Sequence, residues 1–227
     1  MKIKLPKAPS EKTYLKLSIF LVCFTFIYYI QNNDKYFITL NCTFNLLPFI
    51  FFLFAATCIL STKVQKGIFT ILLLNLLAGP LHLLSHHKLY ISTIKSIGMQ
   101  ASHDEEHHDS DVNKNIIPVM KESFFNFFGM GLFWIPFTYL YLDIWICLLW
   151  GIGYSSFHNV NQRLWPEVHE YHHVNNNTNL GPDYMDILLH TKGNYYCENM
   201  NTGILNIVVT GGTLYSIKHL ILQEKPR

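Results

Sequence analysis

The sequence predicts an all-α membrane protein, a polytopic bundle of about four helical spans. Of its 227 residues, 50% are hydrophobic and only 14% are charged, whereas a soluble globular domain carries roughly 25% charged residues. The hydrophobic residues gather in runs that approach the roughly 20 residues needed to cross a bilayer. Twelve histidines, most of them clustered between or beside these runs, are the third unusual feature. The length allows a single domain.

Three apolar runs come first, at 14–30, 46–61 and 67–84. The first follows the basic start "MKIKLPK" without a small-residue cleavage site, so we expect it to stay in the mature protein as a membrane segment. A longer run, 123–157, has the length of two short spans, and "YLYLD" at 139–143 is a plausible turn. These runs predict helices that cross or enter the membrane.

The tail at 203–222 is only moderately apolar and contains paired glycines, which favour a membrane-surface or packed element over a clean span. The expected organisation is therefore N-terminal membrane segments over 1–66, a histidine-rich core over 67–192 that contains the 123–157 hairpin, and a membrane-associated tail over 193–227.

The orientation signals conflict. The basic N-terminus favours a cytoplasmic start, and three full spans would then put the histidines on the opposite side. The turn at 139–143 has no lysine or arginine, whereas the histidine side carries Lys88, Lys95, Lys114 and Lys121. Both signals agree if one early run does not cross. We expect a multi-pass protein of an endoplasmic-reticulum-like or host intracellular membrane, with its histidines facing the cytoplasm.

Three clusters hold most of the histidines: "HLLSHH" at 82–87, "HDEEHH" at 103–108 and "HEYHH" at 169–173. Each contains a pair at the i, i+4 spacing that shares one helix face. Since the hairpin leaves and returns to the same side, all three clusters are expected to converge. Neutral imidazole is a common ligand of iron, zinc and copper. So many imidazoles predict a cap that binds two metal ions on one membrane face.

Two other interpretations of the clusters stay open. "HEYHH" fits the H-E-x-x-H pattern of zinc peptidases, with Glu170 as general base, and "HDEEH" fits its inverted form. A membrane-embedded zinc metalloprotease needs only one such motif and leaves the 82–87 cluster without a role. A membrane protein that binds or carries metal without catalysis is the second alternative.

The pattern resembles the fatty acid hydroxylase/sterol desaturase superfamily of membrane histidine-box di-iron oxygenases. "HLLSH", "HDEEHH" and "HEYHH" correspond to its three boxes, and "HEYHHVNNNTNLGPDYMDILLHT" is the most specific stretch. The second box is one residue longer than usual, His190 stands where a glycine is common, and His87 ranks below His86 as a ligand. The resemblance implies the metal ligands His82, His86, His103, His107, His108, His158, His169, His172 and His173.

The resemblance also implies the chemistry. Two irons and O₂ would hydroxylate a lipid, a fatty acyl chain or a sterol, with desaturation by the same centre as an alternative. Electrons would come from NAD(P)H through a separate b-type cytochrome or reductase, because the chain shows no haem or flavin fingerprint. Glu170 and Asp186 are the carboxylates expected beside the metal ligands. The aromatic stretch 124–137 is a candidate lining for the lipid path, although lipid-facing or packing surface is its commoner use. No basic stripe indicates a nucleic-acid partner.

Overall fold

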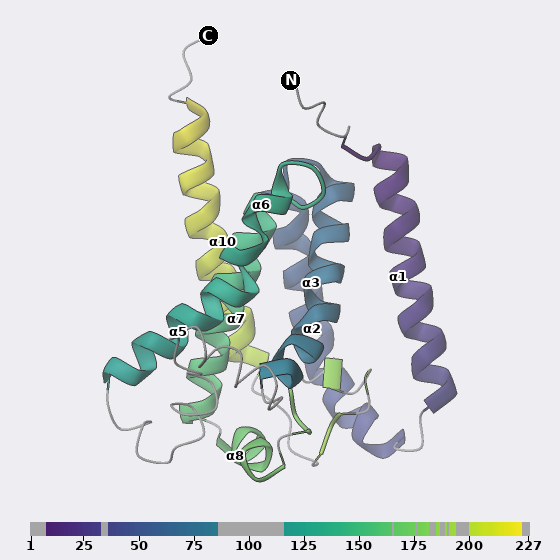
Figure 1. The fold of residues 1–227 in the computed structure, drawn as a ribbon, viewed down its shortest axis with the longest axis vertical. Coiled ribbons are helices and arrows are strands. Elements are labelled where there is room, and N and C mark those ends of the chain that lie inside the picture. Colours follow the sequence, from purple (N-terminus) through teal and green to yellow (C-terminus); the bar gives the residue numbers. More distant parts are fainter. Residues whose placement is uncertain are drawn as a thin grey trace, which may run out of the picture.

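The described part of the chain is all-helical, which confirms the predicted class. The computed structural model describes residues 8–32, 36–85, 116–164, 166–175, 177–181, 185–186, 189, 191–193 and 200–223. Helices run along a common direction, and the short α8 lies across one end of them (Figure 1). The first three helices are α1 (Glu11–Asn32), α2 (Tyr36–Leu60) and α3 (Val64–Ser85).

The second half of the bundle starts with a helical hairpin that contains the run 123–157. Its first arm is broken by Gly131, and its turn lies at 139–142. The elements are α5 (Ile116–Met130), the 3-10 turn η3 (Leu132–Trp134), α6 (Ile135–Thr138), α7 (Ile144–Leu164), α8 (Pro166–Val174) and α10 (Met200–Gln223).

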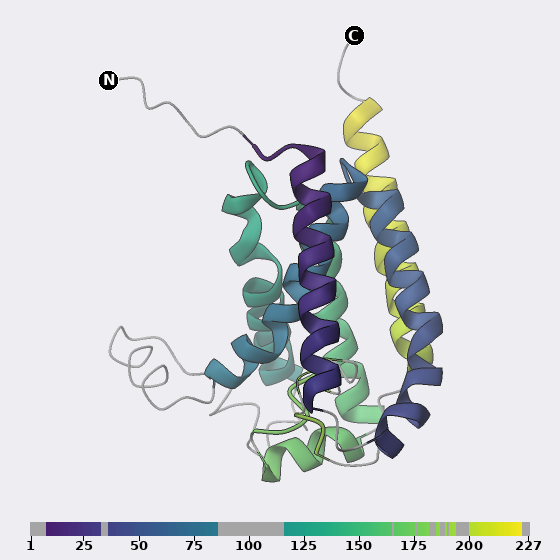
Figure 2. The same cartoon turned by 90° about the vertical axis from the view of Figure 1, so that its right-hand side faces the viewer.

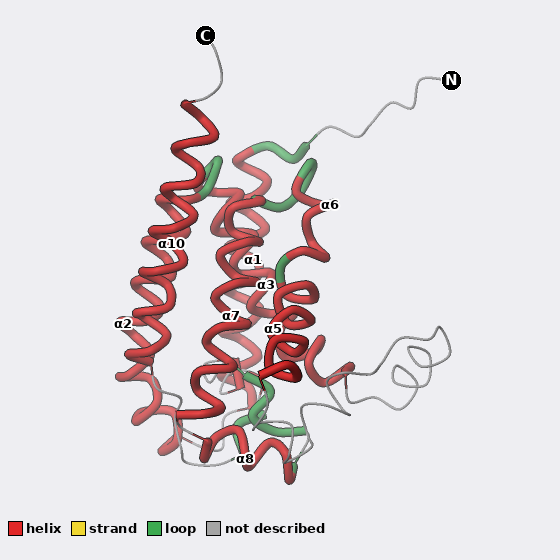
Figure 3. The backbone as a smooth tube through the Cα atoms, turned by 90° about the vertical axis from the view of Figure 1, so that its left-hand side faces the viewer, coloured by secondary structure: helices red, strands yellow, loops and turns green. Residues whose placement is uncertain are grey.

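The helices pack in an order that differs from their order in the chain. The last helix, α10, lies beside α2 and α7, while α5 pairs with α7 and α1 with α3 (Figure 3). Leu60, Leu74, Ile146 and Leu214 bring α2, α3, α7 and α10 into one apolar core, and each is at most 4% exposed. Burial of such side chains stabilises the bundle by about 1.5–3 kcal/mol each. The first helix, α1, and the last helix, α10, are thus packed against the central helices.

Two of the described helices, α3 over Val64–Leu84 and α10, are long and apolar enough to cross a membrane. Only 22% of the apolar window of α10 is buried, whereas an apolar core helix of a soluble protein is mostly buried. Leu205, Val209 and Leu220 are each at least 60% exposed along α10. Contiguous exposed apolar surface of this kind is typical of contact with lipid or another protein.

The tail, predicted as a membrane-surface or packed element, is one continuous helix, α10, that packs against α2 and α7 and is long and apolar enough to span a membrane. Gly211 and Gly212 lie inside it. A methyl group on Gly211 would meet Ala56 at 3.7 Å, an ordinary contact, and one on Gly212 would meet nothing within 4 Å. Each glycine lowers the stability of the helix by about 1 kcal/mol relative to alanine. The packing of α10 against α2 and α7 offsets this loss.

The end of the bundle away from α8 is tied together by polar contacts. Asp143, 1% exposed, precedes α7 and caps it, because its Oδ1 accepts a hydrogen bond from the Trp145 N–H at 3.1 Å. Its Oδ2 accepts from the N–H and hydroxyl of Thr62. The Lys218 ammonium donates to the carbonyl oxygens of Leu60 and Ser61 at the end of α2. The start of α1 and the end of α10 lie at this same end (Figure 2).

Candidate metal centre

Two histidines of the first and third clusters lie ring to ring at the α8 end of the bundle. His82 stands near the end of α3 and is 5% exposed, and His172 in α8 is fully buried. Their ring centroids are 4.7 Å apart and their planes are inclined by 66°. The sequence analysis named both as metal ligands, and the fold brings them together from distant parts of the chain.

The hydrogen bonds of these rings fix which nitrogen carries the proton. His82 Nδ1 lies 2.6 Å from the carbonyl oxygen of Leu180, and His172 Nδ1 lies 2.7 Å from the carbonyl oxygen of Thr178. A carbonyl oxygen can only accept, so each Nδ1 is the donor, and in the neutral ring the lone pair is then on Nε2. Histidines that bind metals are commonly held in this way through their other nitrogen. Both rings therefore fit the role of Nε2 ligands.

The two carbonyl groups belong to one loop, 178–181, which Asp186 holds in place. Asp186 is 2% exposed. Its Oδ1 accepts hydrogen bonds from the Leu180 N–H at 2.8 Å and the Thr191 hydroxyl at 2.6 Å, and its Oδ2 accepts from the Gly181 N–H at 2.8 Å. Asp186 was expected beside the metal ligands. In the structure it acts on His82 through the loop, because it fixes the peptide whose carbonyl group orients that ring.

Asn179, which the sequence analysis did not single out, fastens the same loop to α8. Its side-chain amide donates to the Val168 carbonyl oxygen at 2.9 Å, and its Oδ1 accepts from the Gly193 N–H at 2.9 Å. Its φ of 48° is one that asparagine tolerates better than most residues. A Cβ on Gly193 would lie 2.4 Å from a ring carbon of Tyr171, so only glycine fits there. The asparagine-rich run "NNNTN" was the available signal.

His158 adds a third imidazole from α7. Its ring lies edge-on to that of His82, with centroids 6.3 Å apart. Tyr154, one turn earlier, stacks on the other side at 5.9 Å with an interplanar angle of 5°. His82, His158 and His172, one from each of three helices, thus gather at one place. We call these three the imidazole group.

A carboxylate from α5 also reaches the imidazole group. Glu122 is 6% exposed, and its Oε1 lies 3.3 Å from His158 Nε2. The sequence analysis missed it because it sought carboxylates close in sequence to the histidines. The signal was a single acidic residue followed by the apolar run "SFFNFFGMGLFW", where a buried charge needs a partner.

The other predicted site residues are placed as follows. His173 is half-buried, with its ring centroid 6.1 Å from that of His172, and Glu170 is exposed on α8. His86, His103, His107 and His108 lie outside the described residues, as does the side chain of His169. Among the side chains that the structure describes, no three histidines, cysteines or carboxylates are arranged around a single metal position.

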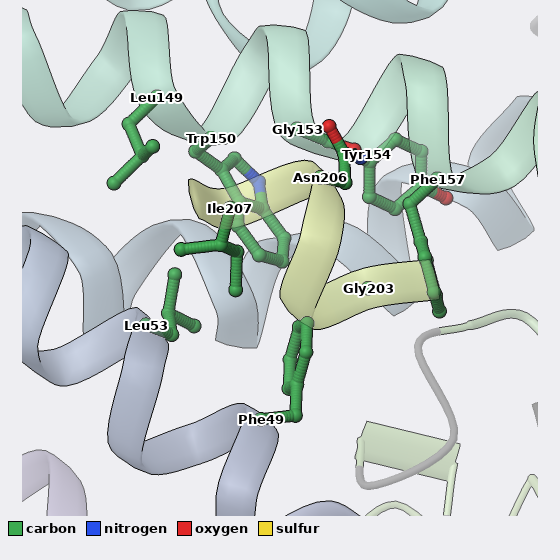
Figure 4. Close-up of a pocket in the computed structure, with 10 residues that line it drawn as sticks. All are labelled: Phe49, Leu53, Leu149, Trp150, Gly153, Tyr154, Phe157, Gly203, Asn206 and Ile207. Carbon is green, nitrogen blue, oxygen red and sulfur yellow. The ribbon is translucent and has the colours of Figure 1, made fainter. Parts of the chain in front are cut away.

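An apolar slot borders the imidazole group on the side of the bundle core. It lies between α2, α7 and α10 and is small, with a cavity volume of about 30 Å³ (Figure 4). Phe49 and Leu53 of α2, Trp150 and Tyr154 of α7 and Ile207 of α10 contribute to its walls. Tyr154 both lines the slot and stacks on His158. Tyr154 therefore links the slot to the imidazole group.

The aromatic stretch 124–137, a candidate lining of the lipid path, is not among the walls of this slot. Phe124, Phe128 and Phe133 are each 47–57% exposed. Gly131 and Gly151 serve packing of the hairpin instead, because a Cβ on Gly151 of α7 would lie 2.6 Å from the Cα of Gly131. The stretch is thus surface and packing residues, which was the commoner use.

Comparison of the chain with protein-family models, with curated proteins and with solved structures found no match. The functional argument therefore rests on the histidine pattern of the sequence and on the geometry described above.

Proposed function

We propose that the chain is a membrane-bound non-haem di-iron oxidoreductase that uses O₂ to hydroxylate a lipid, either a fatty acyl chain or a sterol. Desaturation of the lipid by the same centre is the variant of this proposal. The observation that carries it is the pair His82 and His172. Both rings are buried, they lie 4.7 Å apart, and backbone carbonyl groups of one loop hold their Nδ1–H groups so that Nε2 is the donor atom.

The proposed donor set is the nine histidines of the sequence analysis, of which His82, His158 and His172 gather in the described part of the chain. When bound, a pair of irons supplies the activation of O₂ and the removal of a hydrogen atom from an unactivated carbon–hydrogen bond, which acid–base groups alone do not achieve. Imidazole ligands suit iron, and sites with open positions are typical of oxygenases.

In this proposal the protein's own residues orient the metal ligands, keep water from them and guide the lipid. Asp186 fixes the loop that orients His82, and the full burial of His172 keeps water from that ring. The apolar side chains around the slot beside Tyr154 are where we expect the hydrocarbon part of a lipid to approach the imidazole group. The slot and the exposed apolar face of α10 support a lipid substrate that arrives from the bilayer.

The alternative of a zinc metalloprotease finds less support. The pattern H-E-x-x-H uses His169 and His173 as ligands and Glu170 as base, and gives His172 no role. Yet His172 is fully buried and its ring contacts that of His82, while Glu170 is exposed. The histidine-box interpretation accounts for the burial of His172.

The membrane part of the proposal is a multi-pass protein with about four spans, α3 and α10 among them, in an endoplasmic-reticulum-like or host intracellular membrane. The imidazole group would face the cytoplasm, where a separate b-type cytochrome or reductase can deliver electrons from NAD(P)H. Lys12, Lys63 and Lys66 lie toward the opposite end of the bundle and by themselves favour the reverse orientation.

A labelling experiment decides between the two orientations. Asn177 is exposed beside α8, so a cysteine at this position reports on the face that carries the imidazole group. Reaction of Asn177→Cys with an impermeant thiol reagent from the cytoplasmic side supports the proposed orientation. Reaction only from the other side contradicts it.

The central test combines metal and product analysis. The full chain, purified from cells grown with iron, is expected to hold about two irons per chain and to insert one atom of ¹⁸O₂ into a lipid. His82→Ala and His172→Ala should lose iron and product together. His219→Ala is the matched control, because His219 is an exposed histidine of α10 outside the imidazole group. A wild-type chain that holds tightly bound zinc, no iron, and consumes no O₂ would overturn the proposal.

A further inference from the structure

The indole N–H of Trp150 meets no hydrogen-bond acceptor in the part of the chain that the structure describes. Trp150 is 5% exposed and lines the apolar slot, and Figure 4 shows its nitrogen on the edge of the ring toward α10. Trp134, in the other arm of the hairpin, differs, because its Nε1 donates to the Gly129 carbonyl oxygen at 3.1 Å. A buried indole N–H usually has such a partner, so an unpaired one beside a cavity calls for an explanation.

Asn206 of α10 brings a second donor to the same slot. One atom of its amide lies 2.7 Å from the Gly153 carbonyl oxygen, and because a carbonyl oxygen only accepts, that atom is Nδ2. Its Oδ1 is occupied by the hydroxyl groups of Ser156 at 2.8 Å and Thr210 at 3.1 Å. An amide nitrogen carries two hydrogens, and the second hydrogen of Asn206 has no acceptor among the described residues. The two helices thus fix an amide that still has an N–H group to donate.

The slot therefore offers hydrogen-bond donors in an otherwise apolar lining. The Tyr154 hydroxyl, the other polar group of the lining side chains, is turned away from Trp150 (Figure 4). A water molecule or an alcohol brings hydrogens that need an acceptor of their own, whereas a carbonyl oxygen has two lone pairs and can accept from both donors. The cavity volume is about 30 Å³, and a single water molecule needs about 10–15 Å³. The slot thus has room for a carbonyl group and a neighbouring carbon, while the rest of a lipid would lie outside it.

We propose that the slot binds the carbonyl oxygen of a neutral lipid, an ester or a ketone, with Trp150 Nε1 and Asn206 Nδ2 as the two donors. Binding at this site requires no metal ion. The inference rests on the proposed function only where it names the substrate, for which it favours an acyl ester over a sterol, whose hydroxyl hydrogen finds no acceptor in the slot. A site built from buried donors discriminates against an analogue that lacks the oxygen, because the donors then stay unpaired.

The test compares three probes of equal chain length, 2-undecanone, 2-undecanol and undecane, on the full chain in detergent. Affinities are compared at equal mole fractions of probe in the micelles, so that partition into detergent does not enter the comparison. Trp150→Phe removes the N–H group and keeps an aromatic ring in the slot. Trp134→Phe is the matched control, because the indole of Trp134 already has its acceptor and does not line the slot. The indole signals of the ¹⁵N-labelled chain are recorded as well, and that of Trp150 is assigned by its absence from Trp150→Phe.

The wild-type chain is expected to bind the ketone about tenfold or more tightly than the alkane, and more tightly than the alcohol. Trp150→Phe should lose this preference, Trp134→Phe should keep it, and the Trp150 indole proton should shift downfield with the ketone and not with the alkane.

Three results would each overturn the inference: equal affinity of the wild-type chain for ketone and alkane, an alcohol that binds as tightly as the ketone, or a preference that survives in Trp150→Phe. If Trp150→Phe does not fold, a Trp150 signal that saturating ketone leaves unmoved in the wild-type chain overturns it. A chain that prefers the ketone but holds no iron overturns the proposed function and leaves this inference standing, and an iron-loaded chain without the preference does the reverse.

Discussion

Replacement of Asp186 by asparagine should weaken metal binding at the proposed metal centre while the helix bundle stays folded. Asp186 accepts hydrogen bonds from Leu180, Gly181 and Thr191. An asparagine has one oxygen in place of two, so in either orientation its NH₂ group faces at least one of these donors. A hydrogen bond to a charged group contributes about 1.5–3 kcal/mol, and a buried donor left without a partner costs about 1–3 kcal/mol more. The loop should therefore lose at least about 2.5 kcal/mol of local stability.

Two measurements report this loss of local stability in the loop. Since each 1.4 kcal/mol is a factor of ten, amide hydrogen exchange at Leu180 and Gly181 should accelerate by about 60-fold or more. His82 loses the fixed carbonyl group that orients it, so the affinity for iron should fall by about 10- to 100-fold. Iron that remains after dialysis against chelators of graded strength reports this fall.

Asp143→Asn is the matched control, because Asp143 is equally buried and also accepts three hydrogen bonds, from Thr62 and Trp145. It lies at the end of the bundle away from the imidazole group. We expect it to lower the free energy of unfolding and to leave iron retention at the wild-type level. The reasoning is refuted if the two variants retain iron equally, or if exchange at Leu180 and Gly181 does not change in Asp186→Asn.

Three further variants test the packing and the slot. Gly151→Ala should lower the free energy of unfolding by about 1–3 kcal/mol, because its methyl group would lie 2.6 Å from the Cα of Gly131. Thermal unfolding measures this change. Gly129→Ala is the control and should lose no stability, because its methyl group meets nothing within 4 Å. Lys218→Met should lower the free energy of unfolding by about 1.5–3 kcal/mol, because it removes two hydrogen bonds to carbonyl groups at the end of α2. Iron content should stay unchanged. An unaltered melting temperature would argue against a stabilising role of these hydrogen bonds. Ile207→Trp places a larger side chain in the slot. It should reduce the yield of lipid product by about tenfold or more while iron is retained. An undiminished yield would exclude the slot from the substrate path.

The helices were predictable because long apolar runs leave the backbone few other ways to satisfy its hydrogen bonds away from water. Runs at 14–30, 46–61 and 67–84 became α1, α2 and α3, each somewhat longer than its run. The tail was predicted less well. Paired glycines lower the helix propensity of the tail and so argue against a long helix. The contacts of α10 with α2 and α7, which stabilise it, come from residues far away in sequence.

The sequence predicted that His82 and His172 would lie together, which the structure shows, but it did not predict the groups that orient them. His82, His172 and Asp186 were named from their spacing and from the resemblance to histidine-box enzymes, since side chains carry the pattern. The groups that orient the rings are the carbonyl oxygens of Thr178 and Leu180, and a backbone group has no signature in the sequence. Glu122 was missed for a related reason, because α5 and α7 meet only after the hairpin has formed.

The two ends of the bundle use buried polar groups differently, and this contrast supports the proposal that the functional site lies at the end next to α8. At the far end Asp143 and Lys218 bind the peptide groups of helix termini, which explains their presence by stability alone. At the other end the peptide groups of loop 178–181 bind imidazoles. A histidine is a poor choice for bonding a carbonyl oxygen, because serine or asparagine would do so at less volume and without a second polar nitrogen to bury. Two such histidines, held at one place with Nε2 as the acceptor nitrogen, support the proposed metal centre.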